Sequence, residues 1–326
     1  MPANVQTMAY YGQKPWHGLG KEVPKGVSAA EMMRAAGLDW EVEIKPARGA
    51  KKINTKGQYS RYEVLRLPRH GTKGRKVLLG LVSRRYVPLQ NSEAFDFFDP
   101  IVRDHKAYFE TAGVLKQGER VWVLAKMPGT IEVVRGDDCS KYLLLSNTHD
   151  GNGSVIVKFT SIRVVCQNTL MLSLKDGTRS YTVRHSMLMQ DKLKNISELL
   201  ALSQRVFEEA DFLFKMMARF EMIGNRMDDY LEAVIPRGHL KNKTDHSPKS
   251  WDDIKELYES RKDLQIQGVK GTLWAAYNAI TTYEDYKKSR EDNRDQRLDR
   301  SWFGSGAEIK LRALEKAREF VNLHVS

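Results

Sequence analysis

Cysteine is almost absent from this sequence, which contains Cys139 and Cys166 and no others. A small secreted protein held together by disulfides needs more cysteines, so that class is excluded. The two residues also lack the Cys-x-x-Cys spacing of a structural zinc site. We therefore expect neither a disulfide framework nor a structural metal.

Long apolar runs are missing as well, since no stretch approaches the roughly 20 apolar residues that cross a bilayer. The N-terminal segment lacks the basic start and apolar run of a secretory signal. Neither G-x-x-x-x-G-K-[ST] nor G-x-G-x-x-G occurs, which disfavours an NTP-driven motor. These absences predict a soluble, cytoplasmic protein that uses no cofactor and contacts no membrane.

Positive charge is in excess and is concentrated in the N-terminal third. The chain has 53 Lys and Arg against 41 Asp and Glu, a net charge of +12. Residues 1–90 hold 17 of the basic residues and 6 of the acidic ones, so the remainder is close to neutral. Between Lys45 and Lys76 there are eleven basic residues and one acid, Glu63. A field of one sign over such a segment attracts polyanions.

Strand-like patterns come first along the chain and helix-like patterns come later. Residues 41–47, 59–67 and 76–83 alternate with the period of strands and are separated by turn-forming segments. From residue 187 onward, apolar residues recur at helical spacing. This order predicts an α+β fold with an N-terminal antiparallel sheet and basic hairpins, followed by a helical region. We divide the chain into a β-rich domain at 1–186 and a helical region at 187–326.

More detailed patterns predict individual elements. We expect a helix capped by Ser92 over residues 92–102, and separate strands at 120–127 and 130–135. Further strands are predicted at 141–147, 154–162 and 180–185. One long helix or a kinked pair should follow residue 187, with helices near 251–260, 272–289 and 307–321.

The basic hairpin region is the strongest candidate for a binding surface. Lys and Arg neutralise phosphates, and exposed tyrosines stack on unpaired bases. The residues predicted to contact nucleic acid are Lys51, Lys52, Lys56, Tyr59, Arg61, Tyr62, Arg75, Lys76, Arg84, Arg85, Tyr86, Arg163 and Arg184.

Four further residues are candidates for catalysis. His149 and Asp150 adjoin each other in Asn-Thr-His-Asp-Gly-Asn-Gly, where they have the chemistry of an acid and a base but also of a tight turn. Cys166 has the chemistry of a nucleophile, with His149 or His185 as its base, or of a buried packing residue. A nuclease or other hydrolase built on these four residues is therefore an alternative to simple binding.

Polar residues within apolar stretches must be hydrogen-bonded or exposed at a binding surface. Arg163, Gln167 and Asn168 form such a group, followed by Arg184 and His185. In the helical region, Trp274, Asn278 and Thr281 lie on neighbouring turns, and we interpret their segment as part of the core.

Several of these segments together resemble the "phage/plasmid-like protein" family, an uncharacterised family of mobile elements. The resemblance covers essentially the whole chain and is carried by Pro15–Gly20, Val82–Ser83 with Tyr86, Gln90–Phe95, Glu110–Gly113, His149–Gly151, Arg163–Leu170, Arg184–His185, and Gly271–Thr272 with Trp274 and Asn278–Ala279.

The resemblance implies a gene carried among the replication, recombination and anti-defence functions of phages and plasmids. Single-strand annealing proteins of phages likewise combine a basic antiparallel sheet with helices and need no ATP, although likeness of fold does not establish function. Our main hypothesis is a non-enzymatic protein that binds or anneals single-stranded DNA. Because the long helical region offers apolar surface, we also expect a homo-oligomer. An anti-defence inhibitor that grips guide RNA or an acidic host protein is a third possibility.

Overall fold

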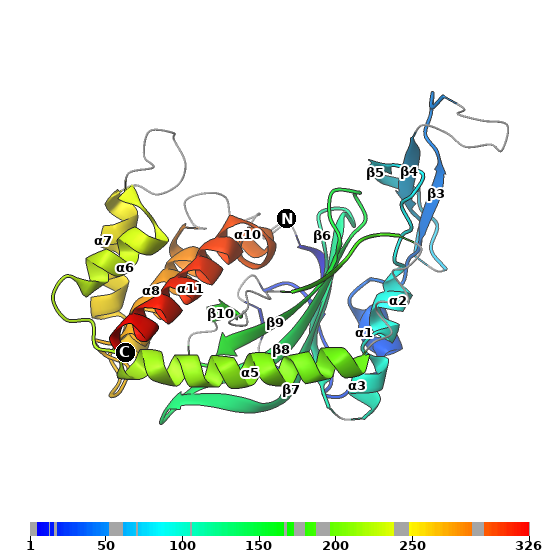
Figure 1. Ribbon diagram of the computed structural model, residues 1–326. Helices are drawn as coiled ribbons and strands as arrows, with labels where there is room; N and C mark the ends of the chain where they lie inside the picture. The colour runs from blue at the N-terminus through cyan, green and yellow to red at the C-terminus, as the bar shows by residue number, and fades with distance from the viewer. Residues whose placement is uncertain are drawn as a thin grey trace. The chain divides into compact units, whose positions relative to one another are not determined.

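The computed structural model describes residues 5–12, 14–15, 18–51, 61–69, 71–104, 106–165, 168–172, 180–186, 196–237, 248–288 and 297–325. Its elements follow the predicted order, with most strands before residue 184 and the long helices after it (Figure 1). The α+β prediction is confirmed. Within the described residues, no helix combines the length and the apolar character that a membrane crossing requires.

The strands are β1 (Val5–Tyr10), β2 (Lys21–Glu22), β3 (Val42–Pro46), β4 (Tyr62–Arg66), β5 (Val77–Val82), β6 (Tyr108–Leu115), β7 (Arg120–Val134), β8 (Asp137–Thr148), β9 (Val155–Arg163), β10 (Asn168–Met171) and β11 (Tyr181–Val183). The helices are α1 (Ala29–Ala35), α2 (Asn91–Asp96), α3 (Asp99–Arg103), α5 (Ile196–Arg219), α6 (Arg226–Val234), α7 (Pro248–Ser260), the 3₁₀ turn η3 (Lys262–Leu264), α8 (Leu273–Thr282), the π-helical turn η4 (Tyr283–Lys287), α10 (Arg297–Phe303) and α11 (Ser305–Val325).

Two sheets organise the strands. The larger one has eight strands, in the order β10-β9-β8-β7-β6-β1-β2, with β11 pairing to β9. Strands β6 to β10 therefore lie side by side in chain order. The smaller sheet has the order β3-β4-β5 and is antiparallel throughout. It is the predicted pair of hairpins, and we call it the basic sheet.

The described chain forms two compact units, each assembled from three segments. Unit 1 comprises Met1–Pro128, Tyr142–Lys158 and Ser180–Leu202, and unit 2 comprises Gly129–Lys141, Phe159–Arg179 and Ser203–Ser326. Both units take residues from either side of position 186. Strands β7, β8 and β9 and helix α5 each contribute to both units.

Two local predictions were wrong. The helix predicted over 92–102 is two short helices, and the residue at the N-cap of α2 is Gln90 instead of Ser92. The Gln90 backbone N–H donates to Glu93 Oε2 over 2.7 Å. Pro100 falls in the first turn of α3, where its missing N–H costs nothing, so it opens a second helix.

The strands predicted at 120–127 and 130–135 are one continuous strand, β7. We had interpreted Pro128-Gly129 as a turn. Gly129 adopts φ 75°, a conformation open to glycine, and β7 continues through this position. The long helix predicted after residue 187 is confirmed as α5, and the helices near 251, 272 and 307 correspond to α7, α8 and α11.

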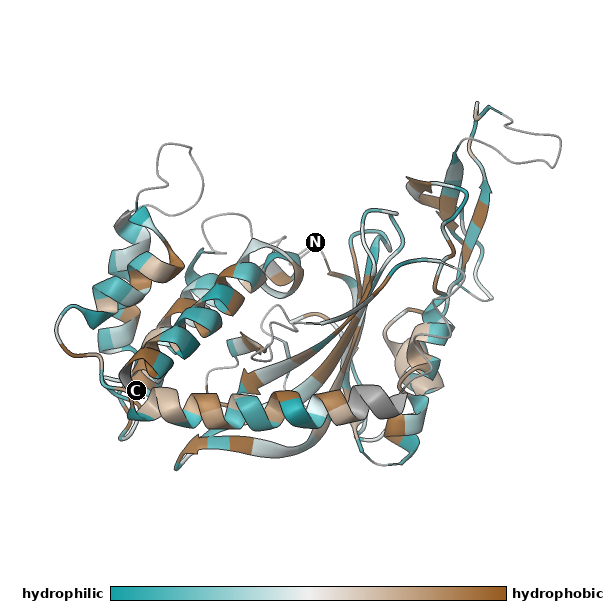
Figure 2. Cartoon of the chain, viewed as in Figure 1, coloured by the Kyte–Doolittle hydropathy of each residue, from teal (hydrophilic) through white to brown (hydrophobic). Residues whose placement is uncertain are grey.

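The core of unit 2 lies between strands and helices of that unit. Phe159 of β9 meets Phe207 of α5, with ring centroids 6.1 Å apart. Phe214 of α5 packs on Trp274 of α8 at 4.6 Å. Figure 2 shows α5 with alternating hydrophobic and hydrophilic residues, as expected for a helix with one buried face. The prediction that the segment around Trp274 belongs to the core is confirmed, since every residue of α8 is buried.

Candidate nucleic-acid interface and buried polar networks

Most of the predicted phosphate contacts that the structure describes lie in the segments that flank the strands of the basic sheet. Lys51, Arg61, Arg75, Arg84 and Arg85 are all exposed, and so are Lys73 and Arg184. Arg61, Lys73, Arg75, Arg85 and Arg184 pair with no acidic side chain among the described residues. These side chains are placed where phosphates can reach them. Lys52, Lys56 and Tyr59 lie outside the described residues.

Other basic residues of the same segment form ion pairs with acidic side chains. Two of these acids lie outside Lys45–Lys76, so the count of charges in that segment did not include them. Lys76, a predicted phosphate contact, forms an ion pair with Glu43 of β3. Lys45 pairs with Glu63 over 3.4 Å, and Arg69 pairs with Asp39 over 2.5 Å. Because the fold brings Asp39 and Glu43, which precede the basic segment, beside Arg69 and Lys76, the unpaired charge is smaller than the count predicts.

Arg66 of β4 is directed inward instead of toward solvent. Its guanidinium lies 4.5 Å from the centre of the Trp40 ring and donates to Gln6 Oε1 over 2.6 Å. It also donates to the Gln117 carbonyl oxygen over 2.8 Å. This arginine therefore anchors the basic sheet within unit 1.

The tyrosines predicted to stack on bases are poorly placed for it. Tyr86 is half-buried, its ring is stacked on His185 with centroids 4.6 Å apart, and its hydroxyl donates to the Thr148 carbonyl over 3.2 Å. Burial raises the pKa of Tyr86 far above its ordinary value. Tyr62 is half-buried as well. Contact of Tyr86 with bases is not supported by this geometry.

His149 is fully buried at the end of β8, in a polar cluster of unit 1. Asn91 Nδ2 donates to the carbonyls of Leu38 and Trp40, so its Oδ1 must be the acceptor for His149 Nε2–H at 3.2 Å. The imidazole ring also meets the edge of Trp40 at 5.3 Å.

Burial is the main cause that lowers the pKa of His149 to about 3, and the nearby charges of His185 and Arg66 act in the same direction. The ring therefore stays neutral at physiological pH. Without exposed surface it cannot take a proton from a nucleic-acid substrate. The predicted acid–base role of His149 is not supported.

Asp150 belongs to a turn. Its Oδ1 accepts the Asn152 backbone N–H over 3.0 Å, and Gly151 adopts φ 80°. His185 is buried, and its Nδ1 lies 3.1 Å from the Val87 carbonyl oxygen. Cys166 lies outside the described residues, so the proposed Cys–His pairing is not tested.

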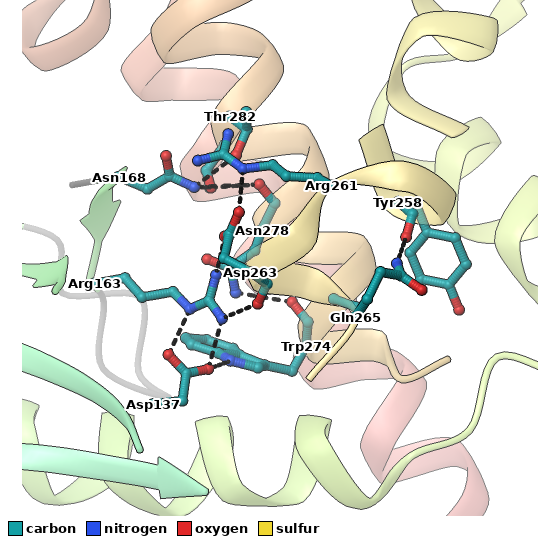
Figure 3. A network of polar contacts seen from close by, with 12 residues as sticks. Asp137, Arg163, Asn168, Tyr258, Arg261, Asp263, Gln265, Trp274, Asn278 and Thr282 are labelled. Atoms are coloured by element: carbon teal, nitrogen blue, oxygen red, sulfur yellow. Dashed lines mark hydrogen bonds and ion pairs between the residues drawn. The ribbon is translucent and has the colours of Figure 1, made fainter. Parts of the chain in front are cut away.

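Arg163, predicted to contact nucleic acid, is fully buried in unit 2, and that prediction was wrong. Its Nε and Nη2 donate to the two carboxylate oxygens of Asp137 over 2.7 and 2.9 Å. Its Nη1 donates to Asp263 Oδ2 over 2.7 Å (Figure 3). Trp274 Nε1–H donates to the same Asp137 carboxylate over 2.8 Å. We call these four residues the Arg163 network.

Asn168 links β10 to α8. Its Nδ2 donates to the hydroxyl oxygens of Thr281 and Thr282 over 3.0 and 2.8 Å. The next residue, Thr169, donates its backbone N–H to Asp285 Oδ2 over 3.0 Å. The sequence left open whether Arg163 and Asn168 belong to a buried network or to a binding surface. In the structure both are buried and hydrogen-bonded within networks. Gln167 lies outside the described residues.

Sequence reasoning missed a second group of charges around η4. Lys310 is fully buried and donates to Asp285 Oδ1 over 2.6 Å and to Ser301 Oγ over 3.0 Å. Arg300 pairs with the buried Glu284. Burial raises the pKa of Glu284, while Arg300 acts in the opposite direction. In the sequence these residues belong to dense mixed-charge stretches that resemble solvated helix faces, so no local signal marks them.

No group of three or more metal-ligating side chains occurs among the described residues. Comparison with known proteins finds no matching curated protein and no matching solved structure. A family model described as "Domain of unknown function (DUF932)" matches residues 78–302. The match includes His149 and Arg163 and begins at β5, so it leaves out β3 and β4. Since it covers more than half of the sequence, the chain belongs to the DUF932 family.

Proposed function

We propose that this chain is a cytoplasmic nucleic-acid-binding protein of a mobile element, with single-stranded DNA as its ligand in recombination or replication. The observation that carries the proposal is a set of exposed cations of unit 1 that pair with no described acid. They are Arg61, Lys73, Arg75, Arg85 and Arg184. The resemblance to phage and plasmid proteins supports the setting.

Electrostatics explains how these residues act. Each phosphate that a Lys or Arg neutralises releases condensed counterions, so affinity falls as salt rises. By contrast, Arg163 is buried against two carboxylates, Asp137 and Asp263, and is not available to a polyanion. Binding is therefore assigned to unit 1 and its exposed arginines.

The test is a salt series with a labelled single-stranded oligonucleotide, from about 50 to about 200 mM salt. Log affinity should fall linearly with log salt, with a slope near −0.7 for each phosphate contacted. The double variant R75A/R85A should bind more weakly and with a shallower slope, by about 1.4 for two lost contacts. The matched control R135A/R219A removes two exposed arginines of unit 2 and should leave both quantities unchanged.

Two results would contradict the proposal. One is absence of binding by the parent protein at about 50 mM salt, where phosphate contacts are strongest. The other is an equal loss in R75A/R85A and in R135A/R219A, which would mean that net charge acts without a defined surface.

We further propose that bound strands are annealed and that the protein is a homo-oligomer. Leu323 of α11 is 73% exposed, and burial of an apolar side chain against another subunit is favourable. Light scattering on the parent and on L323S tests the assembly. Annealing is tested by energy transfer between two complementary labelled strands as they pair. In the variant, oligomer formation and annealing should both decrease if the oligomer aligns the strands.

A further inference from the structure

The solvent-facing side of the basic sheet is partly apolar, which its sequence does not show. Leu78 and Leu81 of β5 are 56% and 51% exposed, whereas Leu79 and Val82 of the same strand are buried. Figure 2 shows β5 as predominantly hydrophobic. Two half-exposed leucines on one short strand need a physical explanation.

Strand register shows that these two leucines share one face. Leu78 pairs with Leu65 of β4, and Leu81 pairs with Glu63. Residues 63 and 65 are two apart on a strand and point to the same side of the sheet. Cross-strand partners also share a side, so Leu78 and Leu81 point there too. They do so although they are three residues apart, because a β-bulge between them adds Leu79 to the strand.

The opposite face of the basic sheet is covered by unit 1. Val64 and Val82 are buried there. A Cβ placed on Gly80 would lie 2.2 Å from the Asp150 carbonyl oxygen, so the backbone of β5 rests directly on the 150–151 turn. Since that face is occupied, only the face with Leu78 and Leu81 can meet a partner. On it the exposed apolar groups are these two leucines of β5, because Leu65 of the central strand is buried.

Charge identifies the partner. On the leucine face itself, Lys45 is paired with Glu63 and Lys76 with Glu43, so the charges that surround the two leucines compensate one another. Exposed cations without a described acidic partner adjoin the strand at both ends in sequence, Lys73 and Arg75 before it and Arg85 after it. An apolar strip between cations complements a polyanion that also presents apolar groups.

We infer that Leu78 and Leu81 form an apolar platform for the unpaired bases of a nucleic-acid strand whose phosphates contact the flanking arginines. This inference rests on the proposed function and names the residues that select single strands. In a duplex the bases are stacked inside and the outer surface is mainly phosphate and sugar, so the platform has no apolar partner there. Leu78 and Leu81 are three residues apart, which is about 10 Å at about 3.3 Å per residue and matches roughly three nucleotides at stacked spacing.

The experiment measures affinity for labelled oligothymidylate and for a duplex of equal length, using the full chain. L78S/L81S should bind the single strand about tenfold more weakly, with an unchanged salt slope and unchanged duplex affinity. I223S removes a 64% exposed side chain of unit 2 and is the matched control. L81F offers an aromatic face for stacking and should bind the single strand several-fold more tightly, a gain that a purely structural role would not produce.

The outcomes separate the two proposals. If the parent binds neither probe, the proposed function is wrong. If the parent binds but L78S/L81S binds the single strand equally well, the platform is wrong while the proposed function stands. An equal loss for both probes also overturns the platform, since the leucines would then shape the sheet. If L78S/L81S has a lower mass than the parent by light scattering without DNA, the leucine face binds a second copy of the chain, and the platform is wrong.

Discussion

The exposed cations of the basic sheet and the buried cations of unit 2 have the same chemistry but different partners. Arg75 and Arg85 are exposed and meet no described carboxylate. Arg163 and Lys310 are fully buried and are held by Asp137, Asp263 and Asp285. The comparison teaches that a basic residue is available for binding only where the fold leaves its charge uncompensated and in contact with water.

The largest expected effect tests the buried side of the comparison. Arg163→Ala leaves Asp137 buried with the Trp274 N–H as its remaining described partner, and removal of one member of a buried ion pair costs about 3–5 kcal/mol. Urea unfolding should show a loss of this size. Lys316→Ala, which breaks the exposed pair with Glu319, should cost less than about 1 kcal/mol. A loss below about 1 kcal/mol for Arg163→Ala would contradict the structural role.

The next effect concerns how the basic sheet is held in unit 1. Gly80→Ala places a Cβ against the Asp150 backbone, which cannot move aside as a flexible side chain can. We expect a loss of about 3 kcal/mol, the upper end for overpacking. Gly74→Ala meets only ordinary contacts with Pro68 at 3.5 Å and is the control. Equal thermal stability of the two variants would show that β5 does not rest on this turn.

A third prediction uses the buried neutral histidine. The pKa of His149 is about 3 in the folded chain and near 6.5 when unfolded, so the unfolded state binds the extra proton between these values. Stability that is fully present above about pH 6.5 is therefore lost as pH falls toward 3. From pH 7 to pH 5 the loss should be about 2 kcal/mol.

His185, whose pKa is also lowered, contributes with the same sign. Denaturant titrations of the parent and of His149→Asn at both pH values isolate the contribution of His149. The variant should lose less stability than the parent over this interval. If the two proteins show the same pH dependence, His149 is not held neutral by its surroundings.

The smallest effect sharpens the exposed side of the comparison. Lys76 is paired with Glu43, whereas Arg75 next to it has no described acidic partner. Lys76→Ala should change the free energy of unfolding by less than about 1 kcal/mol. It should also weaken DNA binding less than Arg75→Ala does, because its charge is already compensated. A greater loss with Lys76→Ala, measured in the same salt series, would show that ion pairing does not decide which cations bind.

Much of the fold was predictable from local pattern. Alternating residues at 42–46, 62–66 and 77–82 specify hairpin strands, and apolar residues at helical spacing specify α5, because both periods follow from backbone geometry alone. Boundaries were harder to predict. Pro128-Gly129 has the composition of a turn, yet Gly129 is accommodated within β7, and Pro100 divides a helix by opening a second one.

The candidate sites divide in the same way. By itself the sequence determined the net charge, the cluster of basic residues around the hairpins and the turn at Asp150, because composition and local backbone preferences are properties of neighbouring residues. Only the tertiary structure decided which of those cations are free. Glu43, Asp263 and Asp285 meet Lys76, Arg163 and Lys310 from 25 to 100 positions away, and the bulge in β5 turns Leu78 and Leu81 to one face. Such pairings depend on strand register and helix packing, which no local window of sequence contains.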